Sequence, residues 1–580
     1  MKLLAIIALL LGASQSAWAG GLSSLPGHVP SQRIARSVHI GRKSSTDKMQ
    51  LAVTLSLKDP AGLADFVKRV YDPADPSFHQ FLTPEQFADK FAPSQKDFDD
   101  VSQYLTAQGL NVVQSHANRL VIDVTGSVAA VESAFQIEMH NYIAADGRIV
   151  HAPTSDPLVS DSVAPQLNGI LGLNSFAHWK KHSKRALTPE MTFGQVSGYM
   201  TPAKIQSAYG LSSITMTGTG ETLALFELDG YTPSDITTYA SNFSFTAPTL
   251  DNVMVDGATG TPGDGADEVT LDIELAMAVA PGVTKIMVYE GPPTASEAQV
   301  IDLYSKIAND NLAKEVSSSW GAAENEVGTN VLNSENSVFL QLASQGQTVF
   351  AAAGDSGAYD DSVDDLNSTL EVDDPGSQPY VTSVGGTTLT LTNGTIYKSE
   401  TSWKTSPASG TFGQSSYNPD EGGGGGISIH WPLPTWQAGL STAANRGSTT
   451  MRMVPDVSLD ADPDTGYAIY VGGTWNVFGG TSCAAPIWAG FSALVNQARV
   501  SNGLTRVGFI NPILYQAAQG AFYSADYHDI KDQSTNLFYP AQTGYDLTTG
   551  WGSFNGGGLF SSLTMNPPAP PTDLTAVVIQ

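Results

Sequence analysis

Strand-like and helix-like runs alternate along the chain from about residue 197 to residue 560. The strand-like runs are ETLALFEL, KIMVYE, KEVSSSWG, GQTVFAAAGDSG and QPYVTSVGG, and the helix-like runs are EVTLDIELAMAVA, ASEAQVIDLYSKIAND and TSCAAPIWAGFSALVNQARV. This order predicts an α/β fold in which helices cover both faces of a parallel sheet. In such folds, functional side chains gather at the carboxyl ends of the strands.

The preceding segment, residues 20–185, has a different character. Thr83 can cap a helix that has Pro84 at its first position, and two later runs, NVVQSHANRLVIDVTG and QIEMHNYIAADGRIVHAP, are typical of strands separated by turns. We therefore expect a compact α+β unit in front of the α/β unit. A chain of 580 residues is also too long for one core of ordinary size.

Charge is divided unevenly between these two units. Residues 1–185 carry a net charge of +1, residues 186–580 carry −29, and eight of the ten histidines lie in the first segment. Either the two domains simply have different surfaces, or the second one works in acid, where few charges are needed. The total charge of −28 argues against nucleic acid as a partner, because binding phosphates requires clustered Lys and Arg.

The N-terminus has the pattern of a secretory signal. Met1-Lys2 is followed by the apolar run LLAIIALLLGA and by Ala17-Trp18-Ala19, so residues 1–19 are predicted to be a signal peptide. The product would then be secreted, to the extracellular medium or a periplasm. A membrane anchor is the alternative, but the run is too short to span a bilayer well, and we expect no membrane association. Cys483 is the only cysteine, so no intrachain disulfide is expected.

Two segments are interpreted as connections. WKKHSKRALTPEMTF, residues 179–193, is the most basic run of the chain and lacks periodicity, which indicates an exposed and easily cut linker. We place the processing linker at residues 186–196, and the alternative is a domain linker that is never cut. The second domain is predicted to span residues 197–562, and the proline-rich tail, residues 563–580, is assigned no function.

A candidate nucleophile lies in GGTSCAAP, residues 479–486. Ser482 can stand at a helix N-terminus, where backbone N–H groups and the helix dipole face an oxyanion. For this octapeptide alone, a structural helix cap is an equally good interpretation. A serine nucleophile needs a base, and the chain has no H-G-T-H pattern such as a subtilisin would supply.

Carboxylates are the alternative to histidine as a base. Glu268 and Asp272 would share one face of a mostly apolar helix, so we expect them to be partly buried and to share a proton. Glu268 could then accept the serine proton while Asp272 orients it; a solvated acidic helix face is the alternative. Asp355, in AAAGDSG, follows an apolar strand. When protonated, it could donate a hydrogen bond to an oxyanion, although turn aspartates are common.

These motifs, in this order, resemble those of the sedolisins, the serine-carboxyl peptidases of the kumamolisin type. SSSWGAAE, GGGGGISIHWPLPTWQ and PDVSLDADPDTGY extend the resemblance over nearly the whole chain, and FHQFLTPEQFADKFAP and VESAFQIEMHNY are similar to the activation propeptide of that family. The resemblance implies a subtilisin-like catalytic domain with helices flanking its parallel sheet, preceded by a ferredoxin-like propeptide domain at residues 20–185. It further implies a triad of Glu268, Asp272 and Ser482, Asp355 in the oxyanion hole, and Glu227 and Trp320 as supporting residues.

The resemblance also implies a site for one calcium ion near the C-terminus. In YHDIK and QTGYD, the carboxylates of Asp529 and Asp546 and the backbone carbonyls of Ile530, Gln542 and Gly544 would be its ligands. Water would complete the roughly 6–8 oxygens that calcium prefers. Gln542 stands where the family usually has glycine, which a backbone ligand tolerates if φ is negative.

The leading hypothesis is a secreted, monomeric, acid-acting endopeptidase of protein or peptide substrates, made as a self-processing zymogen with its own propeptide as an intramolecular inhibitor. The alternatives are a tripeptidyl exopeptidase of the same chemistry and a catalytically silent binding or adhesion protein on a peptidase fold. The uneven charge also motivates a trigger for maturation. Acid would make the histidine-rich front segment more positive and the remainder less negative, which changes their electrostatic match.

Overall fold

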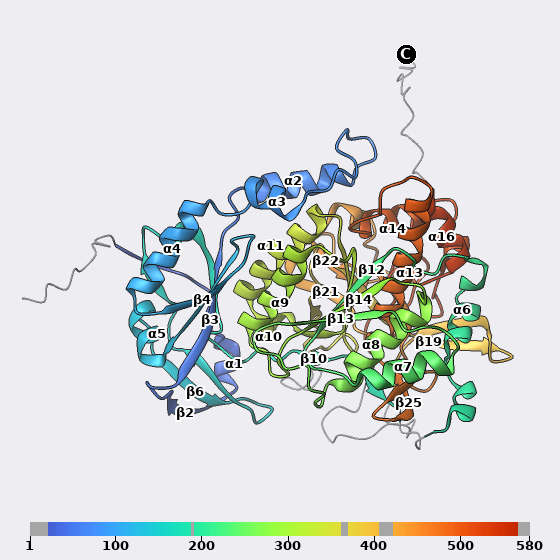
Figure 1. Cartoon of the computed structure of the whole chain (residues 1–580), viewed down its shortest axis with the longest axis horizontal. Helices are drawn as coiled ribbons and strands as arrows, with labels where there is room; N and C mark the ends of the chain where they lie inside the picture. The colour runs from blue at the N-terminus through green and yellow to red at the C-terminus, as the bar shows by residue number, and fades with distance from the viewer. Residues whose placement is uncertain (1–20, 187–190, 361–368, 405–420, 566–580) are drawn as a thin grey trace, which may run out of the picture.

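The structure is a computed structural model that describes residues 21–186, 191–360, 369–404 and 421–565. The predicted signal peptide, residues 1–19, lies outside these ranges, as do part of the predicted linker and most of the predicted tail. The chain forms a smaller N-terminal domain and a larger C-terminal domain side by side (Figure 1).

A four-stranded antiparallel sheet of order β4-β5-β3-β9 forms the centre of the N-terminal domain. With its helices, this sheet has the βαββαβ order of a ferredoxin-like fold, which confirms the prediction. The elements are β3 (Lys48–Leu55), α4 (Gln95–Ala107), β4 (Asn111–Ser115), β5 (Val121–Ser127), α5 (Val128–Phe135) and β9 (Leu167–Leu171).

The two faces of this sheet have different neighbours, because side chains alternate along a strand. Leu51 and Val53 of β3 pack with residues of α4 and α5 in the core of the N-terminal domain. Ala52 and Thr54 face the other way, toward the C-terminal domain, where the Thr54 hydroxyl lies 2.8 Å from Oγ of Ser334 in α11 (Thr329–Ser344). The sheet therefore serves both as a core and as a docking face.

Two further helices, α2 (Pro60–Val70) and α3 (Pro84–Lys90), extend over the C-terminal domain (Figure 1). The predicted cap is present, since Thr83 and Gln86 form a reciprocal capping box. After α2, the Tyr71 hydroxyl donates to the carbonyl of Ala343 and accepts from the N–H of Phe509, both at 2.7 Å. These contacts fasten the N-terminal domain to the second domain away from the main docking face.

The C-terminal domain is built on a sheet of order β13-β14-β12-β15-β17-β19-β20, with β23 also paired to β19. All neighbours are parallel except β20, which runs antiparallel to β19. The strands are β12 (Thr222–Glu227), β13 (Thr249–Met254), β14 (Lys285–Glu290), β15 (Glu315–Ser318), β17 (Thr348–Ala352), β19 (Thr382–Thr392), β20 (Ile396–Ser402) and β23 (Val457–Asp460).

Helices cover both faces of this sheet, as predicted. α8 (Ala266–Val279) and α13 (Thr481–Ser501) pack in one hydrophobic cluster, and α9 (Glu297–Asp310) and α11 pack in another. Every residue of α8 from Glu268 onward is buried. A helix with so little exposed surface is normally apolar all round, so the buried carboxylates of α8 indicate a functional site.

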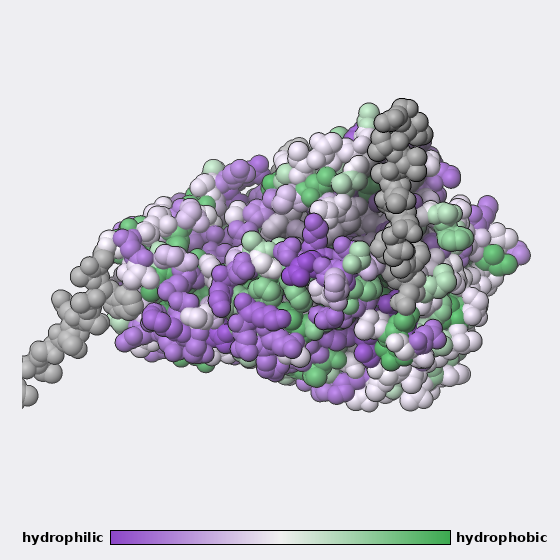
Figure 2. Space-filling model, turned by 90° about the horizontal axis from the view of Figure 1, so that it is seen from above, coloured by the Kyte–Doolittle hydropathy of each residue, from purple (hydrophilic) through white to green (hydrophobic). Residues whose placement is uncertain are grey.

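The surface of the two domains also differs. In Figure 2, strongly hydrophilic residues gather over the N-terminal domain and the adjoining part of the second domain, whereas the far end is richer in weakly polar and hydrophobic residues.

None of the helices in the described ranges is long and apolar enough to cross a membrane. The last helix in the described ranges, α16 (Gly556–Thr564), continues two residues beyond residue 562, where we placed the end of the domain.

Candidate active site

Helices α8 and α13 bring the three predicted triad residues together. Ser482 lies in the first turn of α13, and Glu268 and Asp272 lie one turn apart on α8; all three are completely buried. The N-cap of α13 is Gly480, whose φ of 97° favours glycine. Oγ of Ser482 lies 3.5 Å from the carbonyl oxygen of Ser319, and its hydroxyl is near enough to the Glu268 carboxyl to lower the pKa of that group in part.

Burial dominates the electrostatics of the carboxyl groups. It raises the pKa of Glu268 to about 8, and the pKa of Asp272 is raised by burial and by the nearby Glu227 and Glu268. Oδ1 of Asp272 accepts a hydrogen bond of 2.8 Å from Ser319. Glu268 and Asp272 can therefore stay protonated, and so neutral, at a pH at which an exposed carboxyl group would be ionised.

Glu227 and Trp320 stand behind the triad, where the resemblance placed them. Glu227 is the last residue of β12, and its Oε2 accepts a hydrogen bond of 2.9 Å from Nε1 of Trp320 in β16 (Trp320–Ala323). Oε1 of Glu227 and Oδ2 of Asp272 have no hydrogen-bond donor within the described residues. A single proton held between these two carboxyl groups would satisfy both oxygens.

Asp355 lies three residues after β17, at the carboxyl end of that strand. Its Oδ1 accepts hydrogen bonds from the backbone N–H of Thr481 at 2.8 Å and from the Thr481 hydroxyl at 2.9 Å. Its Oδ2 is buried and has no donor among the described residues. Burial raises the pKa of Asp355 to about 7, so its protonated form can offer Oδ2–H to a ligand in the site.

A segment of the chain itself occupies the site. β10 (Lys180–Lys181) pairs antiparallel with β16, and β11 (Lys184–Arg185) pairs antiparallel with β25 (Thr474–Gly479). Between these two strands, His182 donates its N–H to Ser319 and accepts the N–H of Ser482 at its carbonyl oxygen, both at 3.1 Å. Our interpretation of residues 179–193 as an exposed linker is therefore wrong for residues 180–186, because backbone pairing and the burial of His182 fix them in the site.

The His182 carbonyl oxygen and the carboxyl group of Asp355 both lie close to Gly480. A Cβ atom on Gly480 would stand 2.1 Å from the His182 oxygen and 2.7 Å from Oδ2 of Asp355, so only glycine leaves room for both. The oxygen of this peptide group thus has one donor in place, the Ser482 N–H, and a carboxyl group close by. This is the arrangement of an oxyanion hole around a peptide bond.

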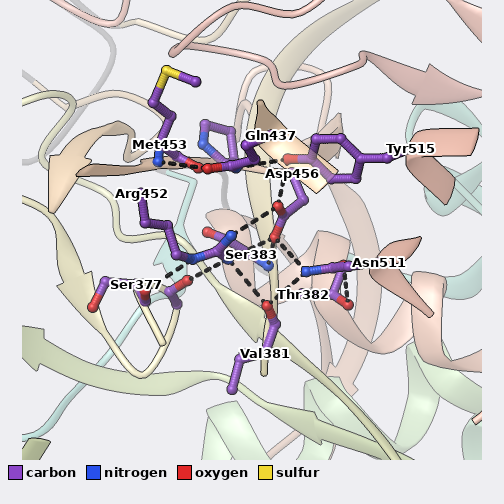
Figure 3. A network of polar contacts seen from close by, with 12 residues as sticks. Ser377, Val381, Thr382, Ser383, Gln437, Arg452, Met453, Asp456, Asn511 and Tyr515 are labelled. Atoms are coloured by element: carbon purple, nitrogen blue, oxygen red, sulfur yellow. Dashed lines mark hydrogen bonds and ion pairs between the residues drawn. The ribbon is translucent and has the colours of Figure 1, made fainter. Parts of the chain in front are cut away.

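The side chain of His182 enters a buried pocket with Asp373. Nε2 of His182 lies 3.0 Å from Oδ2 of Asp373. The carbonyl oxygens of Ser377 and Val381, which follow Asp373 in the chain, accept hydrogen bonds from the buried Arg452 (Figure 3). Arg452 also forms a two-point ion pair with Asp456. This network fixes the backbone that follows Asp373.

The residues of the expected calcium site also lie together. Oδ1 of Asp529 accepts the N–H of Gly544 at 2.9 Å, and Oδ2 of Asp546 accepts the N–H of Gln542 at 2.8 Å. In the described structure, the carbonyl oxygens of Ile530, Gln542 and Gly544 accept no hydrogen bond, and φ of Gln542 is not positive. Two carboxylates and three unused carbonyls are hard oxygen donors, so these residues fit a calcium ion.

Sequence reasoning missed two residues of this site. Ser319 interrupts a run that we predicted as one strand, and it contacts both Asp272 and the His182 backbone. Asp373 lies in EVDDPGSQP, which carried no motif. The net charge of −29 on residues 186–580 indicates only that the basic run could pair with carboxylates there, and it singles out neither Ser319 nor Asp373.

Comparisons with known proteins agree with this geometry. Residues 35–176 match the family model of the pro-kumamolisin activation domain, and residues 258–552 match that of the subtilase family. Kumamolisin of Bacillus sp. (strain MN-32) is 34% identical over 529 residues, which cover 88% of this chain and 90% of kumamolisin. Sedolisin of Pseudomonas sp. (strain 101) is 29% identical over 543 residues, which cover 91% of this chain and 89% of sedolisin.

Two further comparisons concern specificity and fold. Tripeptidyl-peptidase 1 of Canis lupus familiaris is 26% identical over 561 residues, which cover 91% of this chain and 93% of that enzyme. The solved structure of Pseudomonas sedolisin, described as a serine-carboxyl proteinase complexed with two molecules of pseudo-iodotyrostatin, superimposes with a TM-score of 0.56 and 29% identity. It covers 63% of this chain and 97% of that one, and it supports a subtilisin-like fold.

Proposed function

Because this chain belongs to the sedolisin family of serine-carboxyl peptidases and carries the activation propeptide of that family, we propose that it is an acid-acting endopeptidase made as a self-processing zymogen. The observation that carries the proposal is the hydrogen bond from the Ser482 N–H to the His182 carbonyl. A peptide bond of the chain is thereby presented to the candidate nucleophile. The N-terminal domain would inhibit the enzyme until this segment is cut.

The proposed reaction uses the residues in the following way. Oγ of Ser482 attacks the carbonyl carbon of the substrate, and its proton passes to the ionised form of Glu268, which Asp272 orients. The pKa of about 8 belongs to the closed precursor, in which Ser183 and Lys181 lie beside Glu268, so the proposal requires this pKa to fall once the segment leaves the site. The oxyanion is stabilised by the N–H of Ser482 and the protonated carboxyl group of Asp355. Glu268 then gives the proton to the leaving amine as the C–N bond breaks, and water hydrolyses the acyl-enzyme on Ser482.

Endopeptidase activity is favoured over tripeptidyl exopeptidase activity by the course of the segment in the site. A tripeptidyl peptidase needs a free amino group three residues before the bond that it cuts. Here Lys180 occupies that position and pairs with Gly321, while Trp179 and the whole N-terminal domain continue beyond it. The cleft thus accepts a chain that extends in both directions.

Two further parts of the proposal concern the metal and the location. A calcium ion held by Asp529, Ile530, Gln542, Gly544 and Asp546 would supply charge neutralisation and a cross-link between the two ends of this loop, and no catalytic role. We also propose export of the protein, on the basis of residues 1–19, and a monomeric mature enzyme.

The test is casein hydrolysis from about pH 2 to about pH 8 by the wild type, Ser482→Ala and Glu268→Gln. We expect activity that is highest in acid, abolished by Ser482→Ala and reduced by about 10²–10⁴-fold by Glu268→Gln. Peptides with blocked and free amino termini should be cut at similar rates. Hydrolysis that survives Ser482→Ala would exclude Ser482 as the nucleophile, and a strict need for a free amino terminus would favour the exopeptidase.

A further inference from the structure

The segment that fills the cleft has the sequence KKHSKR, residues 180–185, and its basic side chains meet acidic partners on both sides of the bond between His182 and Ser183. Before the bond, Nζ of Lys180 lies 3.6 Å from Oδ1 of Asp360, and Nζ of Lys181 donates a hydrogen bond to the carboxylate of Asp267. After the bond, Nζ of Lys184 lies 3.7 Å from Oε1 of Glu421. These three carboxylates come from separate parts of the C-terminal domain, so they lie along the whole path of the peptide.

His182 is the most deeply buried residue of the segment 180–186. Both His182 and Asp373 are buried, and their nearest nitrogen and oxygen are 3.0 Å apart. The oxygens of Asp373 and Asp360 have no hydrogen-bond donor of suitable geometry within the described residues. Buried carboxyl groups without donors are costly, so this acidic pocket of Asp360 and Asp373 favours a ligand that can donate a proton. Burial lowers the pKa of His182 to about 3, so its imidazole acts in the pocket as a neutral donor.

We propose that the chain cuts itself between His182 and Ser183, and that the mature cleft selects peptides with basic residues on both sides of the cut bond. The first part follows from the backbone contacts, because the His182 carbonyl is the one that accepts the Ser482 N–H. In that cut, the bond from the His182 carbonyl carbon to the Ser183 nitrogen breaks, an ester to Ser482 forms, and the proton from Oγ goes to the new amino group of Ser183. Water then releases the His182 carboxylate.

The second part rests on the proposed peptidase function and names its substrate class. The carboxylates of Asp267, Asp360, Asp373 and Glu421 remain in the C-terminal domain after the segment leaves the site. A basic peptide can replace the lost partners, whereas an acidic peptide would bring like charges together along the same path. Partly exposed pairs such as Lys184 with Glu421 contribute less individually than buried ones, so most of the selectivity should come from the buried pocket.

The cut is tested on the full-length precursor. After purification at neutral pH and brief acidification, the N-terminus of the first large product is determined by mass spectrometry. We expect it to be Ser183, and we expect His182→Glu to slow its appearance by about tenfold or more while His182→Arg does not. A first cut anywhere else, for example within residues 186–196, would overturn this assignment.

Selectivity is tested on the mature wild-type enzyme with quenched peptides, so that no variant has to fold. The peptide KKHSKR in neutral flanks is compared with versions in which the basic residues are replaced by alanine or by glutamate. We expect kcat/KM to fall by about tenfold or more with alanine and further with glutamate. Equal values for the three peptides would refute the selectivity, and a cut at a different bond would refute the register.

Asp373→Asn connects the preference to the pocket. We expect the ratio of kcat/KM between peptides with histidine or arginine and those with leucine before the bond to fall by about tenfold. Asp310→Asn is the matched control, because Asp310 ends α9 at the amino edge of the parallel strands and should leave this ratio unchanged. Casein hydrolysis separates the two levels: an enzyme that digests casein without basic preference refutes only this inference, whereas one that digests nothing refutes the proposed function.

Discussion

Asp355 sets the pH range in which the proposed oxyanion hole is complete. Burial raises its pKa to about 7, although Lys184 and the hydrogen bonds from Thr481 act in the opposite direction. Below this pH, the carboxyl group is protonated and can donate to the oxyanion. As the pH rises through about 7, the group ionises, the donor is lost, and a negative charge faces the developing oxyanion.

Replacing Asp355 with asparagine should therefore change the shape of the pH profile. The amide keeps a donor at every pH, although it is a weaker one than a carboxylic acid. We expect kcat of Asp355→Asn to be about 10-fold lower than that of the wild type in acid, and to lack the wild-type decline above about pH 7. The measurement is kcat against pH with one quenched peptide. If kcat of the variant falls above pH 7 in parallel with that of the wild type, a group other than Asp355 causes the loss of activity at high pH.

At the scale of elements, the relation between Ser482 and Glu268 depends on how closely α13 packs on α8. One point of close approach between the two helices is Gly490 of α13. A Cβ atom there would lie 3.0 Å from the carbonyl oxygen of Ala276 and 3.1 Å from Cβ of Val279. The backbones can approach only because the side chain is absent, and a larger residue must push the helices apart.

Gly490→Val tests this contact. We expect a loss of about 1–3 kcal/mol in the free energy of unfolding, and a fall in kcat because displaced helices misplace Ser482 relative to Glu268. Thermal unfolding and peptide hydrolysis measure the two effects. Gly194→Ala is the control, since a Cβ there meets no atom within 4 Å and φ is not positive. Wild-type stability in Gly490→Val would show that the helices tolerate separation.

The loop between Asp529 and Asp546 gives a second prediction at this scale. Burial raises the pKa of Asp546 to about 7 although four hydrogen bonds act to lower it, so a bound cation would relieve a costly buried group. Removal of calcium by a chelator at neutral pH should lower Tm, and added Ca²⁺ should restore it more effectively than Mg²⁺, which prefers a smaller octahedral site. Asp546→Asn should reduce this response to calcium. An unchanged Tm after chelation would contradict a calcium site here.

The elements of the catalytic domain could be predicted from the sequence because its strands and helices are apolar, regular and bounded by glycines. Glu268 and Asp272 lie on α8 at helical spacing, and Asp355 follows the end of β17. The contacts of Ser319 and Asp373 could not be predicted, since they depend on which segment fills the cleft. The pairing of Lys180 and Lys181 with β16 is such a long-range choice, and no local pattern in a basic run announces it.

At the scale of the whole molecule, acid acts on the contact between the two domains in opposing directions. Buried His116 of the N-terminal domain lies 3.0 Å from Asp302 and 3.6 Å from Asp123, and its pKa is raised to about 9 by these carboxylates against the effect of burial. Its contribution to docking is therefore fully present below about pH 6.5, the ordinary pKa of histidine, and is lost as the pH rises from there through about 9. Burial raises the pKa of Asp302 and, to about 6, that of Asp256, so protonation of these carboxyl groups favours the docked state.

His79 acts in the direction that the proposed trigger requires. It lies between α2 and α3, and its Nδ1 is 2.7 Å from Oγ1 of Thr505 in the C-terminal domain. Burial, with a smaller effect of Arg499, lowers its pKa to about 4. In the undocked domain, the pKa should return to about 6.5. The contribution of His79 to the stability of the docked state is therefore complete above about pH 6.5. On the order of 1–3 kcal/mol of it is lost as the pH falls toward 4.

His79→Gln isolates this contribution, because glutamine keeps a polar group near Thr505 but does not titrate. We expect the variant precursor to mature several-fold more slowly than the wild type at about pH 4–5, with a smaller difference near neutral pH, since its docked state no longer weakens in acid. Gel analysis of the precursor over time measures this. His39→Gln, on the exposed strand β2 (Val38–Arg42), is the matched control. Equal maturation of wild type and His79→Gln across the pH range would exclude His79 from the trigger.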